Sequence, residues 1–507
     1  MTRSPIQTLE ELASTAESLR KQGKKIAHCH GVFDLLHIGH IRHFQEARTF
    51  GDVLIVTITP DVFVNKGFNR PAFPQALRAE AIAALKHVDY VAINNWPTAV
   101  ETIKLLRPHF YVKGPDYKNK EADLTGEIYK EEAAVNSVGG RLAFTDDLTF
   151  SSSNIINKNM PPFSEKMQRY LEDFKKKFSS KQVAETLQSL KNTKVLIIGE
   201  SIIDQYSYCK ALGKSGKEPM LALHYQKEET FPGGALAIAN HLTQFSDHVS
   251  LLSFTGKADP YGAFIEERLD KQVERHLLPL EEGNTIVKRR FVEAHPFQKL
   301  FELYVMTNDE GHDADSKKLL AKLKELLPHY DTVIVADYGH GMLSKEAIAL
   351  LCTESKFLAV NTQINAGNQG FNTIFKYAKA GFICLSENEI RLNVRSKKRD
   401  LREIVKEVAE ALHAERFIVT RGQEGSLCYS KEEGFLEVPA FTGPIVDRVG
   451  AGDAIFSIAA LCAKQKIPLP LVGLIASATG MQAVATLCNE SAINQNALFR
   501  FIEYSLK

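Results

Sequence analysis

The sequence is poor in several features that mark specialised proteins. Among its 507 residues there are seven cysteines and one tryptophan, and no two cysteines form a Cys-X-X-Cys pair. The scattered thiols therefore indicate neither a zinc site nor a disulfide framework. Most of them lie in apolar segments, where a reduced thiol packs as a small hydrophobic group. This cysteine usage predicts a cytoplasmic protein.

Long apolar runs and net charge are also lacking. No run of about 18 apolar residues occurs, which excludes a transmembrane helix, and the polar N-terminal segment resembles neither a secretory signal nor a transit peptide. The 62 lysines and arginines nearly balance the 61 aspartates and glutamates, which leaves a net charge of +1. Such a balance gives no overall attraction for nucleic acid or for an anionic membrane. Anionic ligands must therefore be bound by local sites.

The length suggests about three domains or two large ones. Short β-rich runs alternate with helical patterns over residues 26–160 and again over residues 193–507, which predicts two α/β domains with parallel, doubly wound sheets. Residues 1–25 are predicted to form a helical extension, and the charge-rich residues 161–192 a helical linker. The lysines at 175–177 form either an anion patch or, as is commoner for such runs, a solvated helix face.

The first candidate site follows a predicted strand that ends at Gly31. After a short loop, the segment His37–His40 opens a helix. Two histidines three residues apart on a first helical turn point the same way, and the helix start adds free N–H groups. Gly39 lets a ligand approach the backbone. These parts predict a site for a phosphate chain that gains charge during a reaction. The alternatives are an incidental pair or two metal ligands, although no third ligand is suitably spaced.

The whole string HGVFDLLHIGH resembles the GxFDxxHxGH signature of the cytidylyltransferase-like nucleotidyltransferases. The segments RPAFPQALRAEAIAAL, FYVKGPDY and TFSSSNIIN resemble successive motifs in the adenylyltransferase half of the bifunctional heptose-phosphate kinase/adenylyltransferases. The resemblance implies a Rossmann-like domain in which His37 and His40 stabilise the α-phosphate and Lys113 contacts the triphosphate. It implies these further nucleotide-binding residues: Gly31, Phe33, Gly39, Arg78, Ser151, Ser152 and Ser153. From the residues alone, serines before a helix either cap it or donate to an anion.

The second candidate site is the segment DRVGAGD, residues 447–453, which precedes an apolar helix. Gly450 and Gly452 expose consecutive N–H groups at the helix start, an arrangement that forms an anion hole. Asp453 in the first turn can take a proton from a sugar hydroxyl while those amides stabilise a transferring phosphoryl group. Alternatively, Asp453 is only an N-terminal charge favoured by the helix dipole.

From Lys194 onward the chain resembles the ribokinase-like (PfkB) carbohydrate kinases. The segments that carry the resemblance are GESIIDQY, PGGA, TGKADPYG, DYGHGML, VTRGQEGSLCY and DRVGAGD. It implies an α/β/α sandwich that uses ATP as co-substrate with Mg²⁺ and that pairs as a homodimer. A Walker P-loop is absent, and no resident metal site is indicated. The resemblance makes Asp453 the catalytic base and assigns the anion hole to Gly450, Ala451 and Gly452, and substrate binding to Asp204, Gly233, Gly234 and Asn240.

Lys288 and Arg290 alternate along a predicted strand within TIVKRRFVEAHPFQKLFELY. They can clamp a phosphate that the sugar already carries, as the matching segment of the heptose kinases does. As bare sequence, a KRR run is more often a solvated edge.

Several motifs depart from the resembled pattern. DTTGAGD reads DRVGAGD here, the N-x-x-E motif is only loosely met by Glu387, Asn388 and Glu389, and Asn361 stands where an aspartate is common. In the resembled heptose enzymes the kinase comes first, whereas here the transferase does. These departures leave the activity of the kinase half and its acceptor open.

Together, these features predict a bifunctional enzyme of nucleotide-sugar synthesis. It would combine an ATP-dependent sugar or sugar-phosphate kinase with a sugar-1-phosphate nucleotidyltransferase, and ADP-heptose for lipopolysaccharide is the leading product. Its partners would be sugar phosphates and nucleoside triphosphates, with neither nucleic acid nor membrane. The alternatives are a CDP- or GDP-linked sugar or polyol as product, or a working transferase with a degenerate sugar-binding module. A nicotinamide-dependent dehydrogenase is disfavoured because no GxGxxG follows either leading strand.

Overall fold

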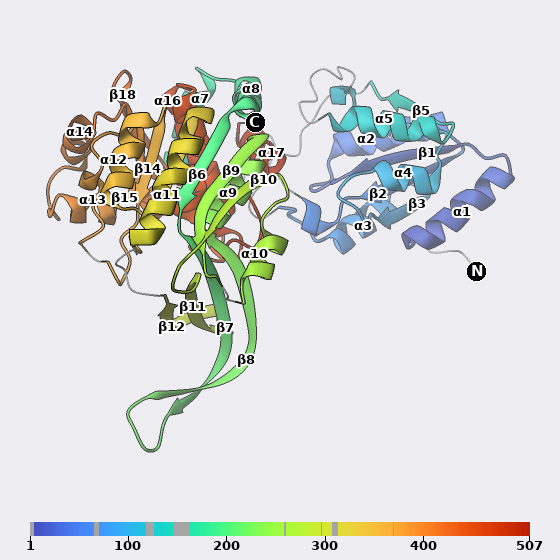
Figure 1. Ribbon diagram of the computed structural model, residues 1–507. Helices are drawn as coiled ribbons and strands as arrows, with labels where there is room; N and C mark the ends of the chain where they lie inside the picture. The colour runs from blue at the N-terminus through green and yellow to red at the C-terminus, as the bar shows by residue number, and fades with distance from the viewer. Residues whose placement is uncertain are drawn as a thin grey trace. The chain divides into compact units, whose positions relative to one another are not determined.

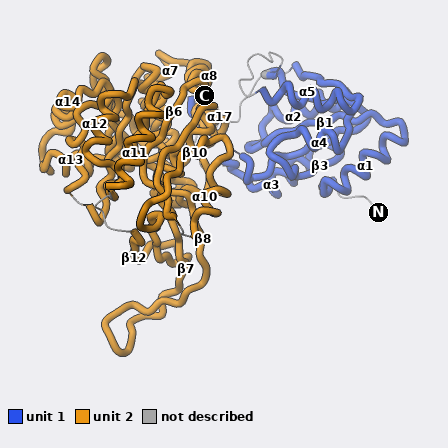
Figure 2. The backbone as a smooth tube through the Cα atoms, viewed as in Figure 1, with its two compact units in different colours: residues 1–162, 503–507 blue, residues 163–502 orange. Residues whose placement is uncertain are grey.

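The chain forms two compact units, which are described separately (Figure 2). Unit 1 consists of residues 1–162 and 503–507, and unit 2 of residues 163–502. The computed structural model describes residues 5–64, 70–117, 126–146, 163–257, 260–295, 297–306, 313–368 and 370–506. The predicted α/β architecture is confirmed in both units. No helix among these residues has the length and apolar character needed to cross a membrane.

Unit 1 is built on a five-stranded parallel sheet with the order β3-β2-β1-β4-β5 (Figure 1). Its strands are β1 (Ile26–Gly31), β2 (Val53–Ile58), β3 (Tyr90–Ile93), β4 (Phe110–Lys113) and β5 (Arg141–Phe144). Its helices are α1 (Leu9–Lys21), α2 (Ile38–Ala47), α3 (Gln75–Ala83), α4 (Val100–Leu106) and α5 (Glu127–Ser137).

The strand order of unit 1 reverses between β1 and β4. The chain winds outward from β1 in one direction through β2 and β3, and in the other through β4 and β5. Apolar residues of α2 and α3 pack on one face of the sheet, and those of α1 and α4 on the other. In open parallel sheets such a reversal leaves a crevice beyond the carboxyl ends of the two central strands. The HGVFD segment and Lys113 lie at those two ends.

Unit 2 contains a nine-stranded sheet with the order β10-β9-β6-β13-β14-β15-β16-β17-β18. Neighbouring strands are parallel, except that β17 runs antiparallel to β16 and to β18. Its strands are β6 (Lys194–Gly199), β9 (His248–Thr255), β10 (Val273–Pro279), β13 (Thr332–Asp337), β14 (Leu358–Thr362), β15 (Phe382–Ser386), β16 (Arg416–Thr420), β17 (Ser426–Ser430) and β18 (Gly434–Val438). Its helices, with the one that ends the chain, are α7 (Glu165–Lys175), α8 (Ser180–Ser189), α9 (Ala235–Thr243), α10 (Gly262–Arg268), α11 (Asp313–Leu326), α12 (Lys345–Glu354), α13 (Glu387–Asn393), α14 (Leu401–Ala411), α15 (Ala451–Lys464), α16 (Leu469–Val484) and α17 (Gln495–Ser505).

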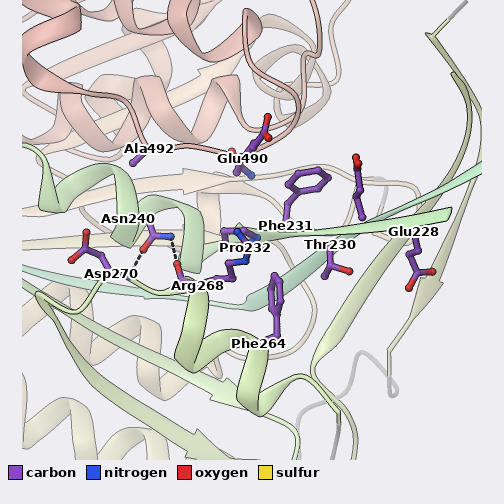
Figure 3. Close-up of a pocket in the computed structure, with 12 residues that line it drawn as sticks. Glu228, Thr230, Phe231, Pro232, Asn240, Phe264, Arg268, Asp270, Glu490 and Ala492 are labelled. Atoms are coloured by element: carbon purple, nitrogen blue, oxygen red, sulfur yellow. Dashed lines mark hydrogen bonds between the residues drawn. The ribbon is translucent and has the colours of Figure 1, made fainter. Parts of the chain in front are cut away.

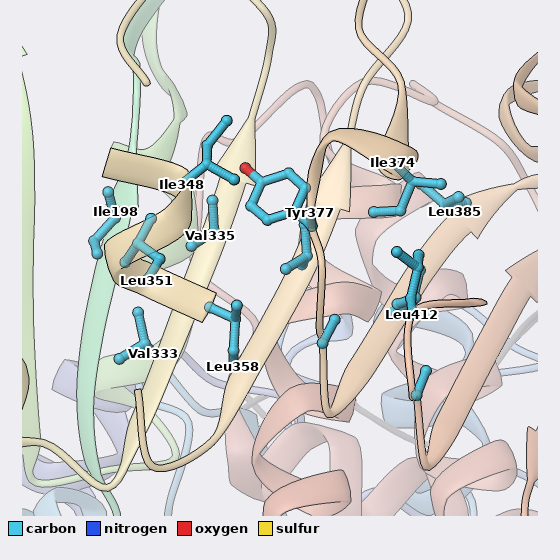
Figure 4. Packing of buried hydrophobic residues seen from close by; sticks show 14 of the residues in the cluster. Ile198, Val333, Val335, Ile348, Leu351, Leu358, Ile374, Tyr377, Leu385 and Leu412 are labelled. Carbon is cyan, nitrogen blue, oxygen red and sulfur yellow. The ribbon is translucent and has the colours of Figure 1, made fainter. Parts of the chain in front are cut away.

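The core of unit 2 explains why its strands are almost continuously apolar. Residues of the sheet pack against α11, α12 and α14 on one face, where Val333, Val335, Ile348 and Leu351 interlock (Figure 4). Helices α9, α15 and α16 lie against strands of the same sheet as part of the opposite layer. A parallel sheet covered on both faces needs apolar side chains on both, and each fully buried aliphatic side chain contributes about 1.5–3 kcal/mol. The result is the predicted α/β/α sandwich.

A second, four-stranded sheet with the order β12-β11-β7-β8 belongs to the same unit and is called the small sheet below. Its strands are β7 (Ser201–Lys214), β8 (Leu221–Gly234), β11 (Ile286–Ala294) and β12 (Phe297–Val305). The hairpin of β7 and β8 extends away from the body of the unit (Figure 1). The small sheet carries Asp204, Gly233, Lys288 and Arg290, so it positions one half of the second candidate site.

Candidate active sites

His37 is held in a defined orientation at the start of α2. It is the N-cap of the helix, and its Nδ1 accepts a hydrogen bond from the Gly39 N–H over 3.1 Å. A ring nitrogen that accepts has no proton, so the neutral ring carries its proton on Nε2. Burial lowers the pKa of His37, and buried Nε2 has no hydrogen-bond partner among the described residues. His37 therefore presents an unused N–H donor.

His40 is stacked on His37. The centroids of the two imidazole rings lie 3.9 Å apart with an angle of 24° between their planes, and the Phe33 ring meets His40 edge-on at 5.4 Å. Phe33 has a φ of +46°. A Cβ on Gly31 would lie 2.9 Å from the Phe33 ring, so glycine is needed beneath it. Gly31 and Phe33 thus shape the loop that aligns the histidine pair.

Lys113, at the end of β4, is paired with an acid that the sequence analysis did not single out. Its Nζ lies 2.8 Å from Oε2 of Glu131 on α5, and the Tyr111 hydroxyl donates to Glu131 Oε1 over 3.0 Å. Burial, reinforced by the charge of Lys113, lowers the pKa of His28 to about 3 and that of His43 to about 4. Lys113 is therefore the ammonium group of this site, surrounded by neutral histidines.

Arg78 lies close to the site but bonds to protein groups. Its Nε donates to the Phe73 carbonyl and its Nη2 to the Thr59 carbonyl, each over 3.0 Å, while its other bonds reach the Val32 carbonyl and the Asp61 carboxylate. In this arrangement Arg78 clamps the loops after β1 and β2, and a role in binding nucleotide stays a prediction. Ser151, Ser152 and Ser153 lie outside the described residues.

In unit 2, the GAG segment opens α15 as the sequence predicts. Gly450 is the N-cap with a φ of +83°, and a Cβ there would lie 2.0 Å from Asn489 Oδ1. A Cβ on Gly452 would meet nothing within 4 Å. Gly450 therefore requires glycine for its backbone conformation and its close packing, whereas Gly452 leaves room for a ligand beside the start of α15. Ala451 lies between them in the first turn.

Asp453 is a buried acid with a strongly perturbed pKa. Its side chain lies in the first turn of α15, and the residue is 7% exposed. Burial raises the pKa of Asp453 to about 7, and the negative charge of Asp204 adds to that effect, whereas the Tyr338 hydroxyl and Lys288 oppose it. A carboxylate with a pKa near the working pH is suited to act as a general base. The alternative, that Asp453 is only an N-terminal charge favoured by the helix dipole, does not account for the burial of its side chain.

The small sheet brings the other predicted residues to one face. Arg290 forms ion pairs with Asp204 and, over 2.7 Å, with Glu302. Lys288 stands opposite Asp204 in the register of β11 and β7, and a Cβ on Gly233 would lie 2.2 Å from Asp204 Oδ2. Lys288 is 7% exposed, and burial lowers its pKa. The interpretation of KRR as a solvated edge is therefore wrong for Lys288.

Gly234 and Asn240, the two remaining residues predicted to bind substrate, differ in their surroundings. Gly234 is the N-cap of α9 with a φ of +56°, and a Cβ there would lie 2.6 Å from the Glu200 carbonyl oxygen. Asn240 bonds to two neighbouring backbone groups: its Nδ2 donates to the Arg268 carbonyl over 2.9 Å, and its Oδ1 accepts from the Asp270 N–H over 2.8 Å (Figure 3). It lines a separate pocket of about 620 Å³ beside β8 and α10. Its geometry is that of a structural anchor, so substrate binding by Asn240 stays a prediction.

The residues at the departing motifs are bonded within the protein. Asn361 Nδ2 donates to the Cys384 carbonyl over 2.7 Å and so links β14 to β15. Glu387 pairs with Arg391 and Arg421 over 2.8 and 3.0 Å, and Glu389 forms the capping box of α13 with Ser386. No group of three potential metal-ligating side chains occurs in the described parts of the chain.

Sequence reasoning also missed the residues that fix Asp447. This carboxylate is 3% exposed, and it is paired with Lys299 of β12 and accepts from the Tyr206 hydroxyl of β7. Although burial alone would raise it, the pKa of Asp447 is lowered by those two partners. The small sheet is thus tied to the loop that leads into the anion hole.

Comparison with known proteins divides the chain in the same way. The pfkB family carbohydrate kinase model matches residues 192–488, and the cytidylyltransferase-like model matches residues 28–158. The bifunctional protein HldE of a Nitratiruptor species is 42% identical over 138 residues, 27% of this chain and 30% of that protein. The bifunctional protein HldE of Aliarcobacter butzleri is 44% identical over 131 residues, 25% of this chain and 27% of that protein.

The chain thus spans about three tenths of the length of these curated relatives. Among solved structures, phosphofructokinase-2 from Escherichia coli in complex with potassium superposes with a TM-score of 0.51 at 13% identity. That superposition covers 62% of this chain and 100% of the phosphofructokinase. At such an identity the likeness shows the fold alone.

Proposed function

Because the chain belongs to the pfkB family of carbohydrate kinases, we propose that unit 2 transfers the γ-phosphoryl group of ATP to a sugar hydroxyl. The observation that carries the proposal is the buried Asp453, with its pKa of about 7, beside the open helix start at Gly452. The hydroxyl proton passes to Asp453 as its oxygen bonds to the γ-phosphorus and the bond to ADP breaks. The N–H groups of residues 450–452 stabilise the charge on the transferring group.

The acceptor is proposed to be a sugar that already carries a phosphate. Lys288 and Arg290 provide two cationic groups on the face of the small sheet that holds Asp204. A phosphate there would compete with Asp204 and Glu302 for the Arg290 guanidinium. Mg²⁺ commonly binds through substrate phosphates and few carboxylates, and this fits a chain whose described residues hold no three-ligand cluster. It would neutralise charge on the ATP phosphates when bound.

For unit 1 we propose the condensation of a nucleoside triphosphate with a sugar 1-phosphate. An oxygen of the sugar phosphate attacks the α-phosphorus, and the bond to the β-phosphate oxygen breaks to release pyrophosphate. The His37 Nε2–H acts as a hydrogen-bond donor and the Lys113 ammonium as a positive charge at the place where the phosphate chain gains negative charge. No proton has to be removed in this step, which agrees with the lowered pKa of His37.

The proposed product is ADP-heptose, a precursor of lipopolysaccharide. The motif resemblance and the two bifunctional relatives support this choice, and a CDP- or GDP-linked sugar or polyol is the alternative. We further propose that the two halves stand in reversed order relative to the resembled enzymes, that the divisions at residues 25, 160 and 192 mark the domains, and that the enzyme is a cytoplasmic homodimer.

The test uses the full chain in two assays. ADP formation is measured with ATP and a panel of sugar phosphates that includes heptose phosphates, and pyrophosphate release is measured with each of the four nucleoside triphosphates and sugar 1-phosphates. The proposal expects both activities, with preference for a heptose and for ATP. Absence of pyrophosphate release with every pair would overturn the transferase assignment, and absence of ADP formation with every acceptor would overturn the kinase assignment.

A degenerate sugar-binding module is the second candidate for unit 2. It is favoured by Glu387, whose carboxylate is occupied by Arg391 and Arg421, and by Asn361, whose amide is structural. An Asp453→Asn variant separates the two candidates. ATP turnover that is unchanged in this variant supports the module, and turnover that is lost supports the kinase.

A further inference from the structure

The loop that follows β14 carries three asparagines whose side chains bond to the backbone. Asn365 Nδ2 and Asn368 Nδ2 donate to the Tyr338 carbonyl oxygen over 2.8 and 2.7 Å. Asn372 Nδ2 donates to the Asp337 carbonyl oxygen over 2.9 Å. The loop after β14 is therefore tied to the loop after β13, the neighbouring strand.

The same asparagines fix the main chain of Gln363, the first residue after β14. Its carbonyl oxygen accepts from Asn368 Nδ2 and Asn372 Nδ2 over 3.3 and 3.0 Å, and its N–H donates to the Asp337 carbonyl over 2.9 Å. Gly339 has a φ of +70°, and a Cβ there would lie 2.3 Å from Asn368 Nδ2. This close packing requires glycine, and it leaves Gln363 little freedom to shift.

From this fixed position the Gln363 side chain reaches the catalytic carboxylate. Its Nε2 donates to Asp453 Oδ1 over 2.8 Å, across 90 residues of sequence. We propose that Gln363 is a positioning residue that holds Oδ1 of Asp453 and leaves Oδ2 as the atom that accepts the proton of the sugar hydroxyl. The inference rests on the kinase function proposed above.

The chemistry of the carboxamide determines which oxygen takes the proton. An amide NH₂ group only donates, so it stabilises the unprotonated form of Oδ1 and makes Oδ2 the more basic of the two oxygens. The proton of the acceptor hydroxyl therefore goes to Oδ2 while the hydroxyl oxygen bonds to the γ-phosphorus and ADP departs. A donor on the carboxylate also favours its charged form.

Other groups act on the same carboxylate from the elements around it. Burial raises the pKa of Asp453 most, and the charges of Asp204 from β7 and Glu389 from α13 raise it further. The hydroxyl of Tyr338, after β13, and the ammonium of Lys288, on β11, lower it. Changing Gln363 alters none of these four side chains, so its own contribution can be measured against a constant background.

The test is the pH dependence of the single-turnover rate of ADP formation by the full chain. ATP is used with whichever of glucose 6-phosphate, mannose 6-phosphate and sedoheptulose 7-phosphate gives the highest rate. Gln363→Met removes the donor, Gln363→Glu adds a negative charge, and Gln363→Lys supplies a charged donor. We expect the acidic limb of the profile to move upward by about one pH unit in the Met variant, further upward in the Glu variant, and downward in the Lys variant.

The control is Gln465→Met, which removes a glutamine donor that bonds to the Ser189 carbonyl over 2.8 Å and should leave the limb in place. Above the limb, a correctly folded Met variant regains a rate within about tenfold of the wild type, whereas a misfolded one is slow at every pH. An unmoved limb, or shifts in one direction for all three variants, overturns the inference alone. A wild type inactive with all acceptors overturns it together with the kinase assignment.

Discussion

The two candidate sites differ in the side chains that stand at their helix starts. In unit 1 the groups at the helix start are two stacked histidines, and burial lowers the pKa of His37, whose Nε2 has no partner among the described residues. In unit 2 the helix start carries Asp453, a buried acid with a pKa of about 7 that can gain and lose a proton. The difference matches the two proposed nucleophiles: a sugar phosphate oxygen is already charged, whereas a sugar hydroxyl must lose a proton.

The largest effect is expected for Asp453→Asn. The amide keeps the size of the carboxylate but cannot accept the proton, so ADP formation should fall by about 10³-fold. Pyrophosphate release by the same protein should be unchanged, since it uses unit 1. The measurement is both assays on one preparation, and a parallel loss of the two activities would contradict the separation of the sites.

The next effect is expected for His37→Ala, which removes the unused donor at the start of α2. Pyrophosphate release should fall by about 10²–10³-fold, and His40→Ala should have a similar effect through loss of the stacked ring. ADP formation should not change. His87→Ala provides the matched control, because His87 lies in the same unit before β3. Undiminished rates in both the His37→Ala and the His40→Ala variant would contradict the role proposed for the histidine pair.

The role of the Arg78 guanidinium in unit 1, structural or nucleotide-binding, can be tested by its effect on stability. Replacing Arg78 with Met removes the donor of three carbonyl oxygens and one of the two partners of the Asp61 carboxylate, which keeps the Gln75 N–H, so unit 1 should lose about 1–3 kcal/mol of stability. Trp96 is the one tryptophan of the chain and lies in unit 1, so its fluorescence during urea unfolding reports this unit. An unchanged transition with a raised KM for the triphosphate would instead make Arg78 a nucleotide ligand.

The smallest effect is a difference in pH dependence. Asp453 must be ionised to accept a proton, and its pKa is about 7, so ADP formation should fall about tenfold between pH 8 and pH 6. Burial lowers the pKa of His37 below its usual 6.5, so pyrophosphate release should fall less than ADP formation over the same range. Rate profiles for the wild type check this, and coincident profiles would argue against distinct titrating groups.

Local motifs made the backbone of both sites predictable. Gly31 and Gly39 frame the turn into α2, and Gly450 with Gly452 frames the turn into α15. In each case the sequence encodes a helix start, and a helix start imposes its own array of N–H groups. The alternation of apolar runs also predicted the α/β architecture, because sheets buried on both faces need such runs.

The partners of the site residues could not be predicted, because they come from distant parts of the chain. Lys299 lies 148 residues from Asp447, and Gln363 lies 90 residues from Asp453. Glu131 sits in a charge-rich helix whose pattern does not distinguish a buried acid from a solvated one. Asn240 shows the same limit: its motif predicts substrate binding, but the sequence does not reveal that its amide bonds to the Arg268 carbonyl at the end of α10.

The anchoring of Asp447 has a consequence for movement of the small sheet. Its carboxylate is held from β12 by Lys299 and from β7 by Tyr206, so moving the small sheet outward would strand a buried negative charge. Stranding such a charge is costly. The ion pair and the hydroxyl bond therefore hold the small sheet to the loop that leads into α15, and displacement of the sheet is opposed by the cost of that buried charge.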